Sequence, residues 1–123
     1  MKMIQIQKPH VIREFSKTAV KLRELITIAL YVKIQGDESF YALEEFIPES
    51  FKVIDADRGK TPNPNVLKWA VIENAKSKTY IYVLDAPSQE GEYNFKGQYM
   101  FEGMKTPKDI LGESRMVVQN NNS

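Results

Sequence analysis

Cysteine is absent from this chain of 123 residues, and histidine occurs only once, as His10. The lack of cysteine excludes disulfide scaffolds, cysteine-bound zinc, iron–sulfur clusters and thiol catalysis. No serine or cysteine nucleophile motif surrounds His10, so we interpret it as an edge or surface residue. Gly91, Gly97 and Gly103 are spaced six residues apart and match no phosphate-binding fingerprint. We therefore expect a non-enzymatic protein with no catalytic residues, no cofactor and no metal.

The chain also lacks a clear excess of charge of one sign and long apolar runs. Seventeen Lys and Arg side chains face sixteen Asp and Glu, which leaves a formal net charge of +1. Nucleic-acid-binding domains usually carry a clear basic excess, so we expect no nucleic-acid partner. The longest apolar-rich run, residues 25–34, is about half of the ~18 residues that read as a membrane-spanning helix. We expect no membrane-spanning segment.

The first residues bear on location. Residues 1–8 alternate apolar and polar side chains and contain no apolar run of secretory-signal length. We expect an extracellular or cell-surface location if the chain is an excised or mature module. If Met1 is the native start, we expect a cytoplasmic protein.

Short β-branched and aromatic runs, separated by glycine and proline, fill most of the chain. Period-2 alternation is clearest in residues 93–101, where one face carries Tyr93, Phe95, Gly97, Tyr99 and Phe101. Further runs of strand length are residues 3–8, 11–15, 67–71, 80–86 and 115–119. Such alternation indicates strands with one buried and one wet face, whose dry faces must meet. We expect an all-β, immunoglobulin-like β-sandwich of about 7–9 antiparallel strands.

The length allows one domain. A chain of 14.2 kDa is too small for two sizeable cores. We expect a single domain over residues 1–118. Residues 119–123 are of low complexity, so we interpret them as a disordered tail or linker.

Residues 16–34 carry two competing patterns. Helical spacing is visible at Ala19, Leu22, Ile26 and Ala29, with Ser16 or Thr18 as N-cap. From residue 26 onward, strict period 2 is visible at Ile26, Ile28, Leu30, Val32 and Ile34. Because most of these residues are β-branched, we favour a strand over 25–34. Residues 16–24 remain open as a loop, a turn or a short helix.

Several short motifs follow one another in an order that is typical of one kind of module. They are residues 41–48 (YALEEFIP), 51–53 (FKV), 67–69 (LKW), 82–87 (YVLDAP) and 91–97 (GEYNFKG). This order, over residues 11–118, resembles an immunoglobulin-like repeat module of archaeal and bacterial cell-surface and dockerin-associated proteins. The resemblance implies a structural or adhesive module without a catalytic site. The chain departs from it at residues 22–24, where a Pro-Gly turn is typical, and at the Pro- and Asn-rich residues 57–65.

Glu44 and Glu45 are the first candidates for chemistry, because glycoside hydrolysis uses two carboxyl groups. Adjacent residues of a strand point to opposite faces, so these two cannot flank one substrate. We expect one of them to be solvated and the other to meet a lysine or a backbone N–H at the end of the sheet.

The sequence of residues 55–59, Asp-Ala-Asp-Arg-Gly, is similar to the start of a calcium loop. Arg58 and Lys60 place positive charge where a cation would lie. A looser site could add Asp37, Glu38 or Asn65. We interpret Asp55 and Asp57 as part of a solvated turn, and cation binding at this loop stays open.

Aromatic side chains decide between the remaining functions. Trp69 shares its face with Leu67 and Val71, which indicates a core residue, whereas we expect Tyr31 and Tyr99 to be exposed. We predict a structural spacer or a protein-interaction or adhesion module, whose partners are other proteins or neighbouring modules of the same chain. The alternative is a module that binds carbohydrate or peptide on an exposed aromatic face or along an edge strand. A small cytoplasmic accessory subunit is a third hypothesis.

Overall fold

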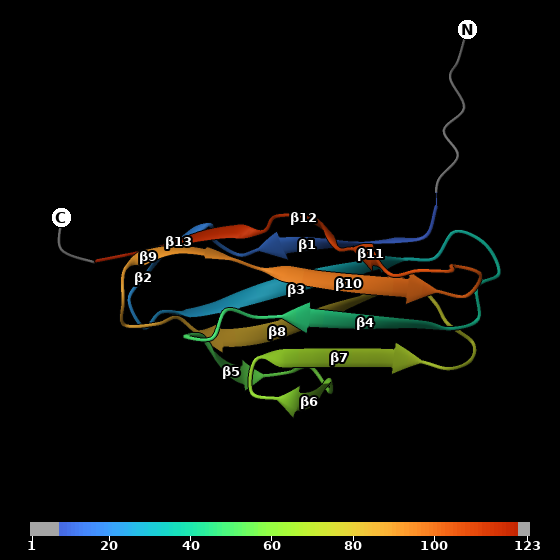
Figure 1. The fold of residues 1–123 in the computed structure, drawn as a ribbon, viewed down its shortest axis with the longest axis horizontal. Coiled ribbons are helices and arrows are strands. Elements are labelled where there is room, and N and C mark those ends of the chain that lie inside the picture. Colours follow the sequence, from blue (N-terminus) through green and yellow to red (C-terminus); the bar gives the residue numbers. More distant parts are fainter. Residues whose placement is uncertain (1–7, 121–123) are drawn as a thin grey trace, which may run out of the picture.

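The computed structural model describes residues 8–120, and every regular element in that range is a β-strand (Figure 1). The strands are β1 (His10–Phe15), β2 (Ala19–Lys21), β3 (Leu25–Lys33), β4 (Tyr41–Phe46), β5 (Lys52–Asp55), β6 (Lys60–Asn63), β7 (Val66–Val71), β8 (Lys78–Asp85), β9 (Gly91–Asn94), β10 (Lys96–Phe101), β11 (Lys108–Asp109), β12 (Leu111–Gly112) and β13 (Arg115–Gln119). The all-β expectation is confirmed. The thirteen strands exceed the expected seven to nine because several contain only two to four residues.

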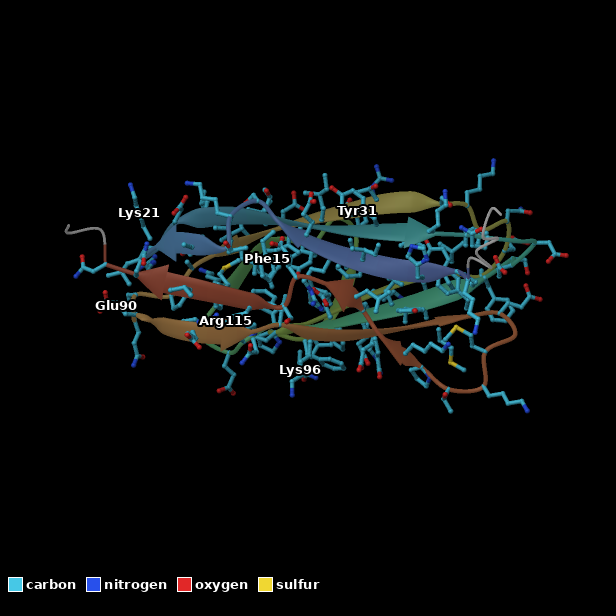
Figure 2. All side chains as sticks on the ribbon, turned by 90° about the horizontal axis from the view of Figure 1, so that it is seen from above. Phe15, Lys21, Tyr31, Glu90, Lys96 and Arg115 are labelled. Atoms are coloured by element: carbon cyan, nitrogen blue, oxygen red, sulfur yellow. The ribbon has the colours of Figure 1, made fainter. Side chains whose placement is uncertain are left out.

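Two five-stranded sheets form the layers of an immunoglobulin-like β-sandwich. Their strand orders are β12-β1-β3-β8-β5 and β11-β10-β4-β7-β6. Figure 1 looks onto β10, β4 and β7, with β3 and β8 in the layer behind them. Figure 2 shows the sandwich from above, with Tyr31 and Lys96 on opposite outer sides and Phe15 between the layers. The inward side chains of both sheets meet in one apolar core, as stacked sheets require.

Chain crossings close the sides of the sandwich. Ile110 joins β11, in one sheet, to β12, in the other, and its side chain is buried. On the opposite side, residues 56–59 join β5 to β6 in the same manner. A third sheet, β2-β13-β9, lies at one end. The outermost strands of the two large sheets have only two or four residues, so they offer little backbone for pairing with another chain.

The first two strands pair in parallel with the last two. β1 pairs with β12, and β2 pairs with β13, in parallel register, whereas the other pairs are antiparallel. This is a difference from the expected antiparallel sandwich. β13 also includes Gln119, which pairs with Lys21, so regular structure extends one residue past position 118.

The competing patterns of residues 16–34 resolve in favour of strands. β3 covers Leu25–Lys33 and alternates between exposed and buried side chains, which confirms the strand prediction for this run. The open stretch 16–24 contains the short strand β2 and a turn in which Arg23 has a positive φ of 59°. Residues 3–7 of the expected first strand lie outside the described residues.

The alternation of residues 93–101 is confirmed, but the run divides between two sheets. β9 pairs with β13, β10 pairs with β4, and the N–H of the intervening Phe95 donates to the carbonyl of Ser114 at 2.7 Å. The expectation that Tyr99 is exposed is wrong, because it is only 5% exposed. Its ring lies on the inward face and packs against Phe101, with centroids 5.5 Å apart. Tyr31 is 41% exposed, as expected.

Residues 8–120 contain no helix of the length and apolar character needed to cross a bilayer.

Candidate functional site

Trp69 lies in the core, as its strand pattern predicts. It is 5% exposed, and its ring packs against Tyr80 and Tyr82 with centroid separations of 5.2 and 5.9 Å. Its indole Nε1–H donates to the carbonyls of Ala56 and Asp57, at 3.2 and 3.0 Å. The buried polar atom of the ring is thereby satisfied, and the indole holds the turn between β5 and β6 in place.

The calcium-like residues 55–59 form that turn. The Asp55 carboxylate accepts the Asp57 N–H at 2.8 Å, and the Asp57 carboxylate accepts the Ile81 N–H at 2.7 Å. A Cβ at Gly59 would come within 2.7 Å of the Trp69 Nε1, so the glycine makes room for the indole. The spacing of Asp and Gly that is similar to a metal loop therefore has a structural use in this turn.

Metal-ligand geometry is missing from the rest of this region. Asn65 donates to the carbonyls of Pro48 and Phe51, each at 2.9 Å, and Glu38 accepts the N–H groups of Gln35 and Gly36. Within residues 8–120, no three His, Asp or Glu side chains gather as a metal site would need.

A buried ion pair lies between the two sheets. Glu45, on β4, and Arg13, on β1, are 0% and 1% exposed. The guanidinium donates to both carboxylate oxygens, through Nε at 3.0 Å and through Nη2. The Tyr82 hydroxyl, from β8, also donates to Glu45. Arg13 Nη1 donates to the carbonyl of Glu113 at 2.9 Å.

Burial and mutual attraction set the ionisation of this cluster. Burial raises the pKa of Glu45, and the hydrogen bonds from Arg13 and Tyr82 oppose that shift. Burial acts to lower the pKa of Arg13, but the contacts with Glu45 outweigh it and the pKa rises. Burial and the neighbouring Glu45 charge raise the pKa of Tyr82 well above its ordinary value. No buried side-chain nitrogen or oxygen of the described residues lacks a hydrogen-bond partner, so the cluster is internally satisfied.

This environment corrects the interpretation of the paired glutamates. Glu44 and Glu45 do point to opposite faces, and Glu44 lies on the outer face, where it is 21% exposed and pairs with Lys68. Glu45, however, meets an arginine and a tyrosine in the core, not a lysine or a backbone N–H at the sheet end.

The alternation of inward and outward side chains along β1 and β4 contains a sequence signal for this pair. Arg13 lies at an inward position between Val11 and Phe15, and Glu45 lies at an inward position after Leu43. Charged residues at apolar positions of two strands are expected to pair, because an isolated buried charge is very costly. Gly97, opposite Glu45 in the register, leaves the space that the carboxylate fills.

The outer face of the β11-β10-β4-β7-β6 sheet is hollowed into a trough of about 270 Å³. One cross-strand row is small and apolar, with Met100, Ala42 and Ala70 side by side. The next row is polar: Glu44 pairs with Lys68 at 2.9 Å and accepts a hydrogen bond from Gln98 at 2.9 Å. Pro107 lines the trough as well. The face thus combines an apolar floor with an ordered polar row.

The outer face of the other sheet carries larger apolar side chains. Leu111, Ile12 and Tyr31 are opposite one another on β12, β1 and β3 and are 50%, 38% and 41% exposed. Ile81, on β8, is 50% exposed and lies opposite Ala29. Exposed apolar side chains at neighbouring positions of a sheet mark contact surfaces more often than isolated ones.

Exposed aromatic rings are few in the described part of the chain and come from separate places. Tyr31 is on β3, Phe40 precedes β4, and Phe46 ends β4. Tyr41 and Phe46 mark opposite ends of β4, so Phe40 and Phe46 are a strand length apart. This arrangement does not provide the row of rings that a carbohydrate platform uses.

Comparisons with known proteins identify the fold. The sequence matches no family model and no curated protein. Solved structures do match: a chain of a type II Cohesin-X-Dockerin complex from Acetivibrio cellulolyticus has a TM-score of 0.63 at 6% identity, covering 91% of this chain and 100% of that one.

A non-cellulosomal cohesin from the archaeon Archaeoglobus fulgidus has a TM-score of 0.54 at 9% identity, covering 94% of each chain. BslA, described as a bacterial hydrophobin, has a TM-score of 0.58 at 12% identity, covering 97% of this chain and 99% of that one. At these identities the likeness concerns the fold alone. The chain has the β-sandwich fold seen in bacterial and archaeal cohesins, which supports the resemblance to dockerin-associated modules at the level of architecture.

Proposed function

We propose that this protein is a non-enzymatic protein-interaction module that binds a protein partner in the trough of the β10-β4-β7 face. The observation behind this proposal is the trough. Small side chains at Ala42 and Ala70 open a concave apolar surface on a sheet whose edge strands are too short for strand pairing. A partner that fills it gains apolar burial at the centre and polar contacts at Glu44, Lys68 and Gln98, which is the usual anatomy of a protein interface.

The structural neighbours agree with this class of function. Two of the similar chains come from structures named as cohesin–dockerin complexes, in which one protein module binds another. We take from these structures only the kind of activity, and we infer the binding surface from the trough of this chain. A cell-surface or secreted location, in a longer scaffold or adhesion protein, is part of the same proposal.

Site-specific photo-crosslinking in an extract of the source cells tests the proposal. A benzophenone amino acid in place of Met100 lines the trough without replacing one of its small residues, and the same group at Thr27 lies on the exposed outer face of the other sheet. We expect position 100 to give one dominant protein adduct, identified by mass spectrometry, and position 27 not to give that adduct.

A second substitution supplies the matched control. Ala42→Arg fills the trough without touching the core, because Ala42 is exposed. We expect it to abolish the adduct at position 100 while the melting temperature stays within a few degrees. An adduct that survives Ala42→Arg, or one that forms equally at position 27, would contradict the trough as the binding surface.

A further inference from the structure

The sandwich has an opening on one side, between β7 and β8. β6 pairs with β7 only along residues 66–68, and β5 pairs with β8 only along residues 83–85. A pocket of about 520 Å³, called the side pocket below, lies where the remaining parts of β7 and β8 face each other across this opening. The stacked, buried rings of Trp69 and Tyr80 contribute to its lining.

The turn at residues 56–59 borders the side pocket and is fixed to both sheets. The Trp69 indole donates to the carbonyls of Ala56 and Asp57, and the Asp57 carboxylate accepts the Ile81 N–H at 2.7 Å. Arg58, which also lines the pocket, has a positive φ of 64°. Glycine and asparagine adopt this conformation more readily than arginine does, so the backbone of the turn does not explain an arginine here.

Cationic side chains converge on the side pocket. Those that line it are Arg58, Lys60, Lys68 and Lys78. Lys68 pairs with Glu44 at 2.9 Å, whereas the other three form no ion pair with a carboxylate of residues 8–120. Among the lining residues, Asp57 is the single carboxylate, and one of its oxygens already accepts the Ile81 N–H. The pocket therefore holds an excess of positive charge.

This charge is unfavourable in the protein alone. Lys60 and Lys68 lie directly opposite each other on β6 and β7, and like charges at opposed positions of a sheet destabilise it. The Lys78 ammonium lies 4.7 Å from the centroid of the Tyr80 ring, on the same pocket. An anion bound among these side chains would relieve the repulsion.

The side pocket adjoins the trough. Lys68, Trp69 and Ala70 line both hollows, so the apolar floor of the trough ends beside the cationic side chains. Ile72, which is 84% exposed, adds apolar surface to the side pocket. A single segment that crosses β4 and β7 can therefore meet the apolar floor first and the positive charges next.

We propose that the side pocket binds a cluster of carboxylates on an acidic segment of the protein partner. The inference rests on the proposed function, because the same partner fills the trough with apolar side chains. Its carboxylates pair with Arg58, Lys60 and Lys78. Such charge complementarity selects among partners more than it adds affinity, so the pocket favours acidic segments over neutral ones that fit the trough equally well.

A capped peptide of four glutamates is the probe for the side pocket alone, and a peptide of four glutamines is its neutral counterpart. Amide chemical shifts of the intact protein locate binding, and the emission of Trp69, the single tryptophan of the chain, reports it independently. We expect at least tenfold tighter binding of the acidic peptide, which weakens as salt is raised. Shifts should concentrate at residues 57–60 and 78–80.

Matched variants separate the side pocket from the general charge of the protein. Arg58→Gln, Lys60→Gln and Lys78→Gln together should lower the affinity for the acidic peptide at least tenfold. The control combines Lys21→Gln, Lys96→Gln and Lys108→Gln, which remove the same charge from positions outside the pocket and should leave the affinity within twofold.

Lys60→Gln alone distinguishes a binding role from a structural one. At low salt it should raise the melting temperature slightly, because it removes the repulsion with Lys68, and added salt should erase the gain. A lower melting temperature in this variant would show that Lys60 stabilises the fold and would overturn the proposal.

Further results would also overturn it. They are equal affinity for the glutamine peptide, equal losses in the two triple variants, and no binding at millimolar peptide. Tighter binding of a sulfated oligosaccharide than of the acidic peptide would assign the pocket to a sugar instead.

The crosslinking adduct at position 100 keeps this inference distinguishable from the proposed function. The triple variant of the side pocket should lower the yield of the adduct at least threefold, and the triple control should not. An adduct that forms equally in both would overturn the acidic partner and leave the trough as the binding surface. A parent protein without the adduct would contradict the trough, whatever the peptides show.

Discussion

The interior has two neighbouring regions in which different kinds of side chains fill the space between the sheets. Around Trp69, the space between the sheets is filled by aromatic rings whose polar atoms reach backbone carbonyls or, for Tyr41 and Tyr80, each other at 2.6 Å. Around Glu45, the space is filled by a carboxylate, a guanidinium and a phenol. Both regions are fully buried and fully hydrogen-bonded.

The difference lies in what happens when one member is removed. Loss of an aromatic ring leaves an apolar cavity, whose cost depends on how far its neighbours relax. Loss of one charge leaves the other buried without its partner, which is costly even though replacement of the whole pair by apolar residues is often neutral. The aromatic region therefore stabilises through each ring separately, and the charged region holds as a unit.

Glu45→Leu should give one of the two largest losses of stability. It leaves the Arg13 guanidinium in the core without its carboxylate, which is expected to cost about 3–5 kcal/mol in the free energy of unfolding. Urea denaturation measures the change. As the control, Arg13→Met and Tyr82→Phe added to Glu45→Leu should restore most of the stability. A single variant as stable as the parent would show that the two regions do not differ in this way.

Trp69→Ala should cost a similar amount, about 3–5 kcal/mol, by emptying a large buried aromatic site. Thermal unfolding measures the loss, and the parent protein should show blue-shifted tryptophan emission that resists quenching. We expect that no substitution of the neighbouring side chains restores the stability of Trp69→Ala, in contrast to the charged cluster. A red-shifted, readily quenched Trp69 and an unchanged melt would contradict its place in the core.

Alkaline pH should reveal buried tyrosines in both regions. Burial raises the pKa of Tyr41 and Tyr82, so the folded state keeps both phenols protonated after the unfolded chain begins to ionise. Their contribution to stability is present below the unfolded pKa of about 10 and is lost as the pH rises above it, by up to ~1.4 kcal/mol per pH unit for each tyrosine.

Denaturation series from pH 8 to 11.5 measure this slope. Tyr41→Phe and Tyr82→Phe should each make it shallower, since phenylalanine does not ionise. The Tyr31→Phe variant is the exposed control and should change the slope less: the hydrogen bond to Glu14 raises the pKa of that phenol, but solvent screens the interaction. Equal slopes in the parent and both core variants would contradict the raised pKa values.

Lys68→Ala should have the smallest effect, about 0–0.5 kcal/mol in unfolding free energy. Its ion pair with Glu44 has the same chemistry as the Arg13–Glu45 pair, but the lysine side chain is 52% exposed and solvent screens the attraction. The same chemical denaturation that resolves Glu45→Leu should barely detect this change. A loss as large as that of the buried pair would show that burial is not what separates the two.

Much of the secondary structure could be predicted because its signal is local. Alternation in residues 25–33 and 96–101 reports which side chains face a dry layer, and those strands form where the pattern places them. The same parity places Tyr99 beside Phe101 on the inward face, so its burial follows from the pattern. The expectation that Tyr99 is exposed disregarded this parity. The turn at residues 55–59 is similar to a metal loop because oxygen-rich turns and metal loops share residue types.

Pairing across the sandwich could not be predicted from local pattern. Arg13 and Glu45 are 32 residues apart in sequence, and their contact depends on both sheet orders and on the layer-to-layer alignment. The trough shares this dependence, since it joins side chains from three strands. It has no motif of its own.

The sequence by itself determined that the chain forms strands, which side of the main strands is dry, and that Trp69 belongs inside, because alternation and apolar character act residue by residue. Only the tertiary structure decided that β1 and β2 pair in parallel with β12 and β13, that chain crossings close the sandwich sides, and that Glu45 meets Arg13 in the core. Each of these depends on contacts between segments far apart in sequence. These contacts contribute to the free energy of folding only once both sheets are in place.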